Sequence, residues 1–303
     1  MFPEPDDEQI RTLLEKHHLP SSGDVERATK EGVTTFVRLI GDYCVRVLKN
    51  DEYQSDIYTE AVAVPAVYAV GVLTPELLAF DTEMDVVSSE VTIFRRAEGD
   101  SLGAIRPFPG SKSIYLEVAR EAAKWDRLVT SVDDPNGWLD VPETIDLSDA
   151  LKGAREAMTA SDVAWVEGLV RRVENITSPV SRFVHNDLHA LNIMIANDRL
   201  SGVIDWGDAG WGDPALNFTS FPAEYLPDAL TEFGDEDYEL IGSCLREVVG
   251  YALYCIGEGK PADGAALQIG QKRWASLLSL WDQPLTAAWR DWVKDPPNLR
   301  KDQ

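Results

Sequence analysis

The sequence is poor in the residues and motifs that mark several common protein classes. It has three cysteines, Cys44, Cys244 and Cys255, which are far apart and lack CxxC spacing, so neither a disulfide framework nor a cysteine zinc site is indicated. The longest apolar run, residues 61–73, has thirteen residues and contains Pro65, which favours a buried helix over a membrane span. The GxxxxGK[ST] pattern of P-loop nucleotide-binding proteins is also missing.

Positive charge is scarce as well. Lysine and arginine number 28 against 52 aspartates and glutamates, which gives a formal net charge of −24. Such a chain is expected to repel nucleic acid and anionic membranes, so neither is predicted as a partner. The charge would suit a cationic substrate, and it would equally serve solubility alone. Because the acidic N-terminus lacks the basic and apolar blocks of a signal peptide, we expect a cytoplasmic location.

The pattern of apolar residues changes near residue 97. Before it, a predicted helix at residues 7–18 is followed by β-rich stretches at 25–30, 34–40 and 43–49, a helix at 56–70, and strands at 77–80 and 91–96. From residue 113 onward the pattern is mostly helical. Strands followed by helices favour an α+β fold, and we predict two lobes, residues 1–97 and 98–303, joined close to Gly99.

Two neighbouring motifs carry most of the functional information. They are His185-Asn-Asp187-Leu-His189-Ala-Leu-Asn192 and Ile204-Asp205-Trp206-Gly207-Asp208. The Asp, the Asn five residues later and the following Asp-aromatic-Gly have the spacing of a kinase catalytic loop and its metal-binding loop. Phosphoryl transfer needs a carboxylate beside the acceptor hydroxyl and hard oxygen ligands for Mg²⁺. We assign the first role to Asp187 and the second to Asn192 and Asp205.

A metal hydrolase is the main alternative for these motifs. His185, Asp187 and His189 form an HxDxH pattern, to which Asp205 and Asp208 would add further ligands. This alternative leaves the Asn at the fifth position after the Asp and the Asp-Trp-Gly strand end unexplained.

The motifs resemble those of the aminoglycoside phosphotransferase and choline kinase-like family, including a later Gly212-Asp213-Pro214. The resemblance extends more loosely over nearly the whole chain. It implies a bilobal protein-kinase-like fold, with a small β-rich nucleotide-binding lobe and a larger helical lobe for catalysis and acceptor binding. It also implies that His185 and Asp213 brace the catalytic loop through hydrogen bonds.

The chain departs from the usual family pattern at three places. Asn186 replaces a Gly, Ala190-Leu191 replaces a Pro-Gly pair, and Asn217 stands where an Asp often follows Gly-Asp-Pro. These changes leave the reaction type untouched and bear on the class of acceptor.

The resemblance further implies a cation on the nucleotide phosphates. Alternation along the strand at 43–49 places Arg46 and Lys49 on opposite faces; we favour Arg46, with Lys49 as the alternative. Glu60, on the following helix, matches the carboxylate that pairs with this cation in the family.

Two further segments match nucleotide-binding positions of the family. The turn at 30–36 would cover the phosphates with its backbone N–H groups and with the hydroxyls of Thr34 and Thr35. Residues 93–99 resemble the hinge, where backbone groups of Arg95 and Ala97 would bind the purine edge.

We therefore predict an Mg²⁺-dependent kinase that moves the γ-phosphate of ATP or GTP to a hydroxyl of a small molecule, such as an aminoglycoside or another antibiotic. Nine carboxylates in residues 222–260 would form an acidic wall for a cationic acceptor, although a solvated helix face has the same composition. The alternatives are a metabolic kinase for a sugar, choline or homoserine-like acceptor, and a pseudokinase, against which the complete Asp187, Asn192 and Asp205 set argues. The oligomeric state is not predicted.

Overall fold

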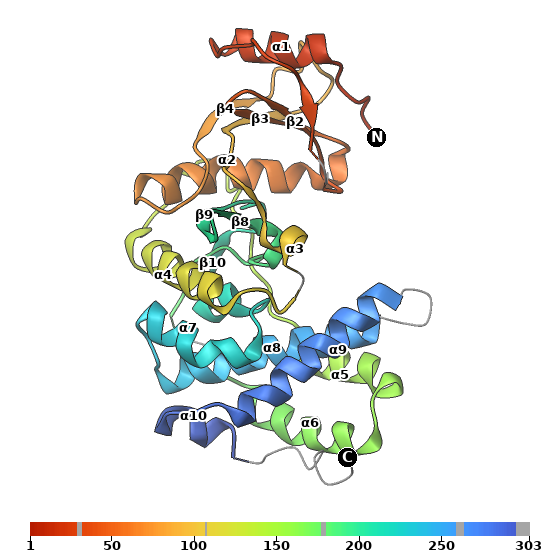
Figure 1. Ribbon diagram of the computed structural model, residues 1–303, viewed down its shortest axis with the longest axis vertical. Coiled ribbons are helices and arrows are strands. Elements are labelled where there is room, and N and C mark those ends of the chain that lie inside the picture. Colours follow the sequence, from red (N-terminus) through yellow and green to blue (C-terminus); the bar gives the residue numbers. More distant parts are fainter. Residues whose placement is uncertain (29–31, 107, 177–179, 259–263, 295–303) are drawn as a thin grey trace.

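A computed structural model describes residues 1–28, 32–106, 108–176, 180–258 and 264–294 (Figure 1). It has the predicted α+β architecture, with an antiparallel sheet in the N-terminal part and a largely helical C-terminal part. The five-stranded sheet has the order β1-β2-β3-β5-β4. Its strands are β1 (Glu26–Arg27), β2 (Thr35–Ile40), β3 (Tyr43–Leu48), β4 (Leu77–Asp81) and β5 (Val91–Arg95).

Two helices sandwich this sheet (Figure 1). Helix α1 (Asp7–Lys16) packs Leu13 and Leu14 against the sheet face that carries Val45 and Ile93. Helix α2 (Gln54–Ala69) covers the opposite face and includes most of the apolar run at 61–73, with Pro65 inside the helix. Because strand residues alternate between faces, Arg46 points toward α2 while Val45 points toward α1.

Two predicted boundaries in this part were wrong. Helix α1 ends at Lys16 rather than at residue 18, because His18 adopts a left-handed φ of 57° and the amide of Leu19 turns back to bond the Leu14 carbonyl. The strand predicted at 25–30 is reduced to Glu26–Arg27, and residues 29–31 lie outside the described residues.

Small sheets hold residues 185–192, the predicted catalytic loop, at the junction with the helical part. Strand β7 (Arg182–Val184) pairs with β10 (Gly210–Gly212), and β6 (Asp100–Ser101) pairs with β8 (Ile193–Ala196), which pairs with β9 (Arg199–Val203). Gly99, just before β6, has φ 82°, and a Cβ there would lie 2.0 Å from the Ile195 carbonyl oxygen. Only glycine fits this connection between the two parts of the chain.

The remaining helices build the C-terminal core. They are α3 (Leu102–Ile105), α4 (Lys112–Leu128), α5 (Leu147–Ala154), α6 (Ala160–Val173), α7 (Leu226–Phe233), α8 (Tyr238–Glu258), α9 (Gly264–Ser279) and α10 (Ala287–Trp292). Within the described part of the chain, α8 alone is long and apolar enough to cross a membrane by composition, and 72% of its most apolar window is buried in the fold. That burial is typical of a core helix.

Candidate active site

The catalytic loop is anchored through His185. Phe183 and Val184 of β7 are fully buried, and they carry the chain directly into this completely buried imidazole. His185 Nε2 lies 3.0 Å from the Ile204 carbonyl oxygen, and its Nδ1 lies 3.3 Å from the amide of Asp187. Burial lowers the pKa of His185 to about 4, so the neutral ring donates from Nε2 and accepts at Nδ1.

This bonding pattern excludes the HxDxH metal site. Both ring nitrogens of His185 are used by backbone groups, and neither is left for a metal. His189 Nε2 lies 3.6 Å from Asp187 Oδ2, at ion-pair distance. Of the three HxDxH side chains, those of Asp187 and His189 face each other, and that of His185 is turned to the backbone.

The bracing of the loop includes a residue that the resemblance did not assign to it. His185 takes part as expected. Asn217 adds a further contact, because its Oδ1 accepts the His185 amide at 2.9 Å and the Trp125 indole N–H at 3.2 Å. Asp213 caps the short helix at Pro214–Phe218 by accepting the Ala215 amide at 2.9 Å, and its bracing of the loop stays a prediction. The Asn at position 217 therefore preserves an acceptor where the family often has Asp.

Asn186 explains another departure from the family pattern. Its φ of 64° lies in the left-handed region, where glycine is the usual residue and asparagine is among the best tolerated alternatives. The chain thus keeps the same sharp turn between His185 and Asp187. Leu191, the other bulky replacement, packs against α3, where a Cβ on Gly103 would lie 2.8 Å from Leu191 Cδ2.

Asp187, Asn192 and Asp205 converge at the end of this loop. Asn192 Nδ2 donates to both the backbone oxygen and Oδ2 of Asp187, each at 2.9 Å, and this leaves its Oδ1 as a ligand atom. The Ile204 amide donates to the Asn192 carbonyl at 3.0 Å and so holds Asp205 next to the loop. Burial, and then the negative charge of Asp205, raise the pKa of Asp187, while His189 opposes the rise.

Arg46 reaches the same point from the N-terminal sheet. Its Nη1 contacts both carboxylate oxygens of Glu60, at 2.6 and 2.7 Å, and its Nη2 contacts Asp205 Oδ1 at 2.9 Å. Its Nε donates to the hydroxyl of Thr35 at 3.3 Å. The ion pair expected between Arg46 and Glu60 is therefore present, and it extends to Asp205.

The pKa values of Arg46, Glu60 and Asp205 are shifted by burial and by the charges of one another. Burial raises the pKa of Glu60 to about 7, although Arg46 pulls it down. Burial also disfavours the Arg46 cation, but Glu60 and Asp205 outweigh it and raise the pKa of Arg46 above its usual range. Burial likewise opposes the charge of Asp205, yet Arg46 holds the pKa of that carboxyl below its usual value.

The other predicted nucleotide contacts lie around this trio. Thr35 is buried beside Arg46, and Thr34 is half-buried just before β2. Lys49, the alternative cation, donates instead to the Gly32 carbonyl at 2.6 Å, within the turn predicted to cover the phosphates. The first two residues of that turn, 30 and 31, lie outside the described residues.

The two hinge candidates are placed differently from each other. The amide of Arg95 donates to the Glu76 carbonyl at 2.9 Å, and its guanidinium lies over the Tyr43 ring and beside the Glu76 carboxylate. Ala97 is half-buried where the chain leaves the sheet. Both residues line a cavity of about 290 Å³ together with Pro75.

Three more carboxylates lie at this site, and the sequence analysis named only Asp208 among them, as a ligand in the metal-hydrolase alternative. Burial, followed by the charges of Asp187, Asp56 and Asp140, raises the pKa of Asp208 to about 7. Asp208 stands within a recognised motif, but the kinase interpretation gave it no role. Asp56 and Asp140 carry no local signal, because tertiary contacts alone bring them here: a Cβ on Gly207 would lie 2.8 Å from the Cβ of Asp56.

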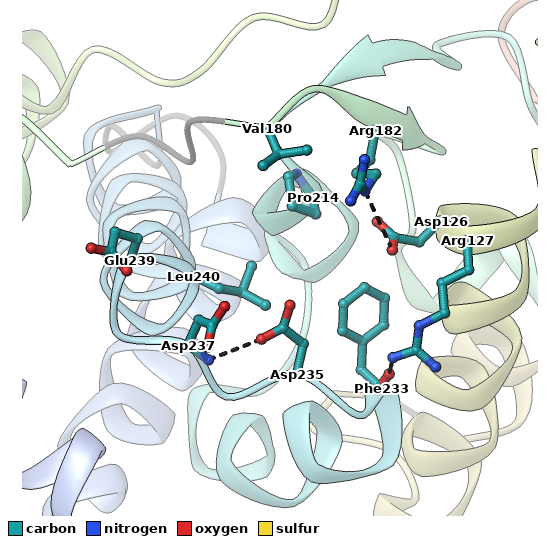
Figure 2. Close-up of a pocket in the computed structure, with 10 residues that line it drawn as sticks. All are labelled: Asp126, Arg127, Val180, Arg182, Pro214, Phe233, Asp235, Asp237, Glu239 and Leu240. Atoms are coloured by element: carbon teal, nitrogen blue, oxygen red, sulfur yellow. Dashed lines mark hydrogen bonds and ion pairs between the residues drawn. The ribbon is translucent and has the colours of Figure 1, made fainter. Parts of the chain in front are cut away.

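The acidic wall expected from residues 222–260 is dispersed over the C-terminal part. Asp228 pairs with Lys112, Glu232 with Arg120, and Glu247 with Arg246. Three more of these carboxylates line a separate pocket of about 210 Å³, in which Asp235 and Asp237 lie across from Arg182 and Asp126 (Figure 2). None of the residues that line this pocket belongs to the catalytic loop.

A second acidic cluster is already occupied by a lysine. Asp81, Glu83 and Asp85 are the one group in the described part of the chain whose oxygens lie close enough together to hold a metal ion. The Nζ of Lys16 sits among them, within 2.9 Å of all three carboxylates.

Comparisons with known proteins show the family and the fold of this chain. The model of a family described as the phosphotransferase enzyme family matches residues 27–240. No curated protein matches the sequence. Three similar solved structures are the GDP and kanamycin complex of an aminoglycoside phosphotransferase, a choline/ethanolamine kinase family protein from Mesorhizobium loti, and a thermostable mutant of the aminoglycoside phosphotransferase APH(4)-Ia with ADP and hygromycin B.

These structures share the fold at low sequence identity. Their TM-scores are 0.60, 0.57 and 0.52, at identities of 16%, 19% and 19%. The matches cover 89%, 95% and 89% of this chain, and 98%, 98% and 97% of the other chains, in the same order.

Proposed function

This chain belongs to the phosphotransferase enzyme family, and from that premise we propose that it transfers the γ-phosphoryl group of ATP or GTP to a hydroxyl of a small molecule. The observation that carries the proposal is the convergence of Asp187, Asn192 and Asp205 with Arg46 at one point between the sheet and the catalytic loop. Structures with this fold have been solved with GDP and with ADP, which supports a nucleotide donor.

In the proposed reaction, Asp187 orients the acceptor hydroxyl and takes its proton. The hydroxyl oxygen forms a new bond to the γ-phosphorus as the bond to the β–γ bridging oxygen breaks, and a nucleoside diphosphate leaves. The hydrogen bond from Asn192 fixes the Asp187 carboxylate, and the raised pKa of Asp187 makes it a better proton acceptor than an exposed aspartate.

The donor set fits a magnesium ion. Asn192 Oδ1 and the Asp205 carboxylate are hard oxygen ligands, the kind that Mg²⁺ prefers, and we propose that they hold it. When bound, the ion would neutralise charge on the phosphates. Arg46, oriented by Glu60, is proposed to bind the phosphates, with Thr34 and Thr35 beside them and the backbone of Ala97 at the purine. For Arg95, the backbone carbonyl is proposed to contact the purine, because the backbone amide already donates to the Glu76 carbonyl.

Two acceptor classes are proposed. Aminoglycosides or related antibiotics are supported by the kanamycin and hygromycin B complexes of proteins with this fold. A hydroxylated metabolite is favoured by the dispersal of the expected acidic wall into ion pairs with Lys112, Arg120 and Arg246. We further propose that the boundary between the two lobes lies between residues 97 and 98. We also propose that the protein works in the cytoplasm without nucleic-acid or membrane partners.

The proposal is tested by a phosphoryl-transfer screen of the full chain with ATP and with GTP, against aminoglycosides, sugars, amino alcohols and hydroxy acids. We expect Mg²⁺-dependent turnover of one acceptor class, and slow nucleotide hydrolysis without an acceptor. A chain that binds no Mg²⁺-nucleotide and hydrolyses none would instead be a pseudokinase.

A further inference from the structure

Arg273 of α9 is held between two aromatic rings. Its guanidinium carbon lies 4.1 Å from the centre of the Tyr251 ring and 4.8 Å from that of Phe108. Its Nη1 donates to the backbone oxygen of Ser220 at 3.1 Å, and its Nε is buried without a hydrogen-bond partner. We call Phe108, Ser220, Tyr251 and Arg273 the Arg273 cluster.

Arg273 has no carboxylate partner among the described residues. This is unexpected in a chain where acids outnumber bases by 52 to 28, and where Arg46, Arg120 and Arg246 all pair with carboxylates. Partial burial of an unpaired cation costs free energy, and the faces of two aromatic rings offset that cost only in part. An external anion would complete the site.

The Arg273 cluster is connected to the catalytic loop from two sides. Phe108 follows α3, which packs against Leu191 of the loop at Gly103. Ser220 follows the short helix that contains Asn217, whose Oδ1 accepts the amide of His185.

The catalytic carboxylate also acts on this cluster electrostatically. Burial raises the pKa of Tyr251, Arg273 opposes the rise, and the charge of Asp187 contributes to it. The Tyr251 phenol therefore lies within electrostatic range of Asp187.

We propose that the Arg273 cluster binds an anionic group of the acceptor, a carboxylate or a phosphate ester, while the acceptor hydroxyl faces Asp187. The inference rests on the proposed phosphotransferase function and narrows its acceptor to a hydroxylated anion. A planar guanidinium clamped by two rings presents its N–H edge in a fixed direction, which suits the oxygens of a carboxylate or phosphate. A polyamine would instead meet a fixed positive charge at this position.

The test is a calorimetric titration of the full chain at constant ionic strength with four probes: glycerol, glycerate, glycerol 3-phosphate and kanamycin. We expect glycerate or glycerol 3-phosphate to bind at least tenfold more tightly than glycerol, and the stronger of the two identifies the anion. Arg273→Gln should remove that tenfold advantage, because glutamine can still donate to Ser220 but carries no charge. Arg290→Gln, an equal change of charge at an exposed residue of α10, should leave it intact.

Two results would overturn the inference. In the first, Arg273→Gln binds the anion as tightly as wild type, and the double variant Arg46→Gln/Glu60→Gln no longer binds it. That pair of results would place the anion in the nucleotide site. The other is transfer of phosphate to kanamycin with a kcat/KM that Arg273→Gln leaves unchanged. Arg273-dependent anion binding in a chain that never turns over nucleotide would support the anion site and count against the proposed phosphotransferase function alone.

Discussion

Arg46 Nη2 lies 2.9 Å from Asp205 Oδ1, so a cation from the N-terminal sheet is paired directly with the carboxylate proposed to bind magnesium. The same guanidinium holds Glu60 of α2 through Nη1. One side chain therefore ties β3, α2 and the loop after β9 together at the junction of the two parts of the chain. In a nucleotide complex, the phosphates would bind Arg46 and the metal ion would bind Asp205, so the two side chains would no longer need each other as partners.

Removal of the Arg46 cation should destabilise the fold. Glu60 is only 3% exposed, and Arg46→Met would leave its carboxylate buried without a counter-charge, at a cost of about 3 kcal/mol in the free energy of unfolding. Arg46→Met/Glu60→Gln should recover at least half of the loss, because no buried charge is then left alone. Urea unfolding of the three proteins measures both effects, and a single variant as stable as wild type would show that Glu60 is not buried as a charge.

Asp187→Asn should keep the fold and lose turnover. An asparagine of the same shape can still pack beside Asn192 but cannot take the acceptor proton, so kcat should fall by about 10²- to 10⁴-fold. Steady-state kinetics with the acceptor found by the screen measures the loss, while the KM for nucleotide should change little. Asp228→Asn, at an exposed carboxylate that pairs with Lys112, is the matched control and should be silent. Full activity of Asp187→Asn would remove this residue from the mechanism.

Asn217 offers a matched pair of substitutions for the bracing of the loop. Asn217→Asp keeps an oxygen that accepts from the His185 amide and the Trp125 indole, so the catalytic loop should stay in place. Asn217→Ala leaves both donors buried without a partner and should cost about 1–3 kcal/mol of stability. Thermal unfolding separates the two variants, and equal melting temperatures would contradict this role.

Glu247 should make stability depend on pH. Burial raises its pKa from 4.5 to about 7 in the folded protein, against the pull of Arg246. Between these values the folded chain keeps a proton that the unfolded chain has released, so the stability that Glu247 contributes falls as the pH rises through this window. Glu247→Gln removes the dependence, and its stability relative to wild type should rise by about 3 kcal/mol between roughly pH 4.5 and 7. A difference between the two proteins that stays constant across this range would refute the shift.

The sequence could predict those parts of the site whose residues lie close together along the chain. Asp187, Asn192 and Asp205 lie in two short motifs whose spacing reflects one loop and the strand end beside it, so their convergence was predictable. The pairing of Arg46 with Glu60 rested on resemblance, because no spacing rule links a strand residue to a particular turn of the next helix. Backbone geometry explains one substitution after the fact: Asn186 replaces glycine at a left-handed position.

The features that sequence could not predict depend on distant segments. Asn217 braces His185 across 32 positions of the chain, and Arg273 of α9 contacts Phe108 in the distant turn after α3, so no local sequence pattern predicts either contact. The acidic wall was expected from composition alone, which does not say where each carboxylate lies. In the structure, three of these carboxylates pair with Arg120, Arg246 and Lys112. Tertiary packing decides where charges face, and composition does not encode it.

The central claim is that Asp205 helps to hold a magnesium ion against a nucleotide. The most direct measurement is calorimetric titration of wild type and Asp205→Ala with ATP and GTP, with and without Mg²⁺. We predict that Mg²⁺ strengthens nucleotide binding by wild type at least tenfold and has no such effect on the variant. The same enhancement in both proteins, or its absence in wild type, would contradict the account.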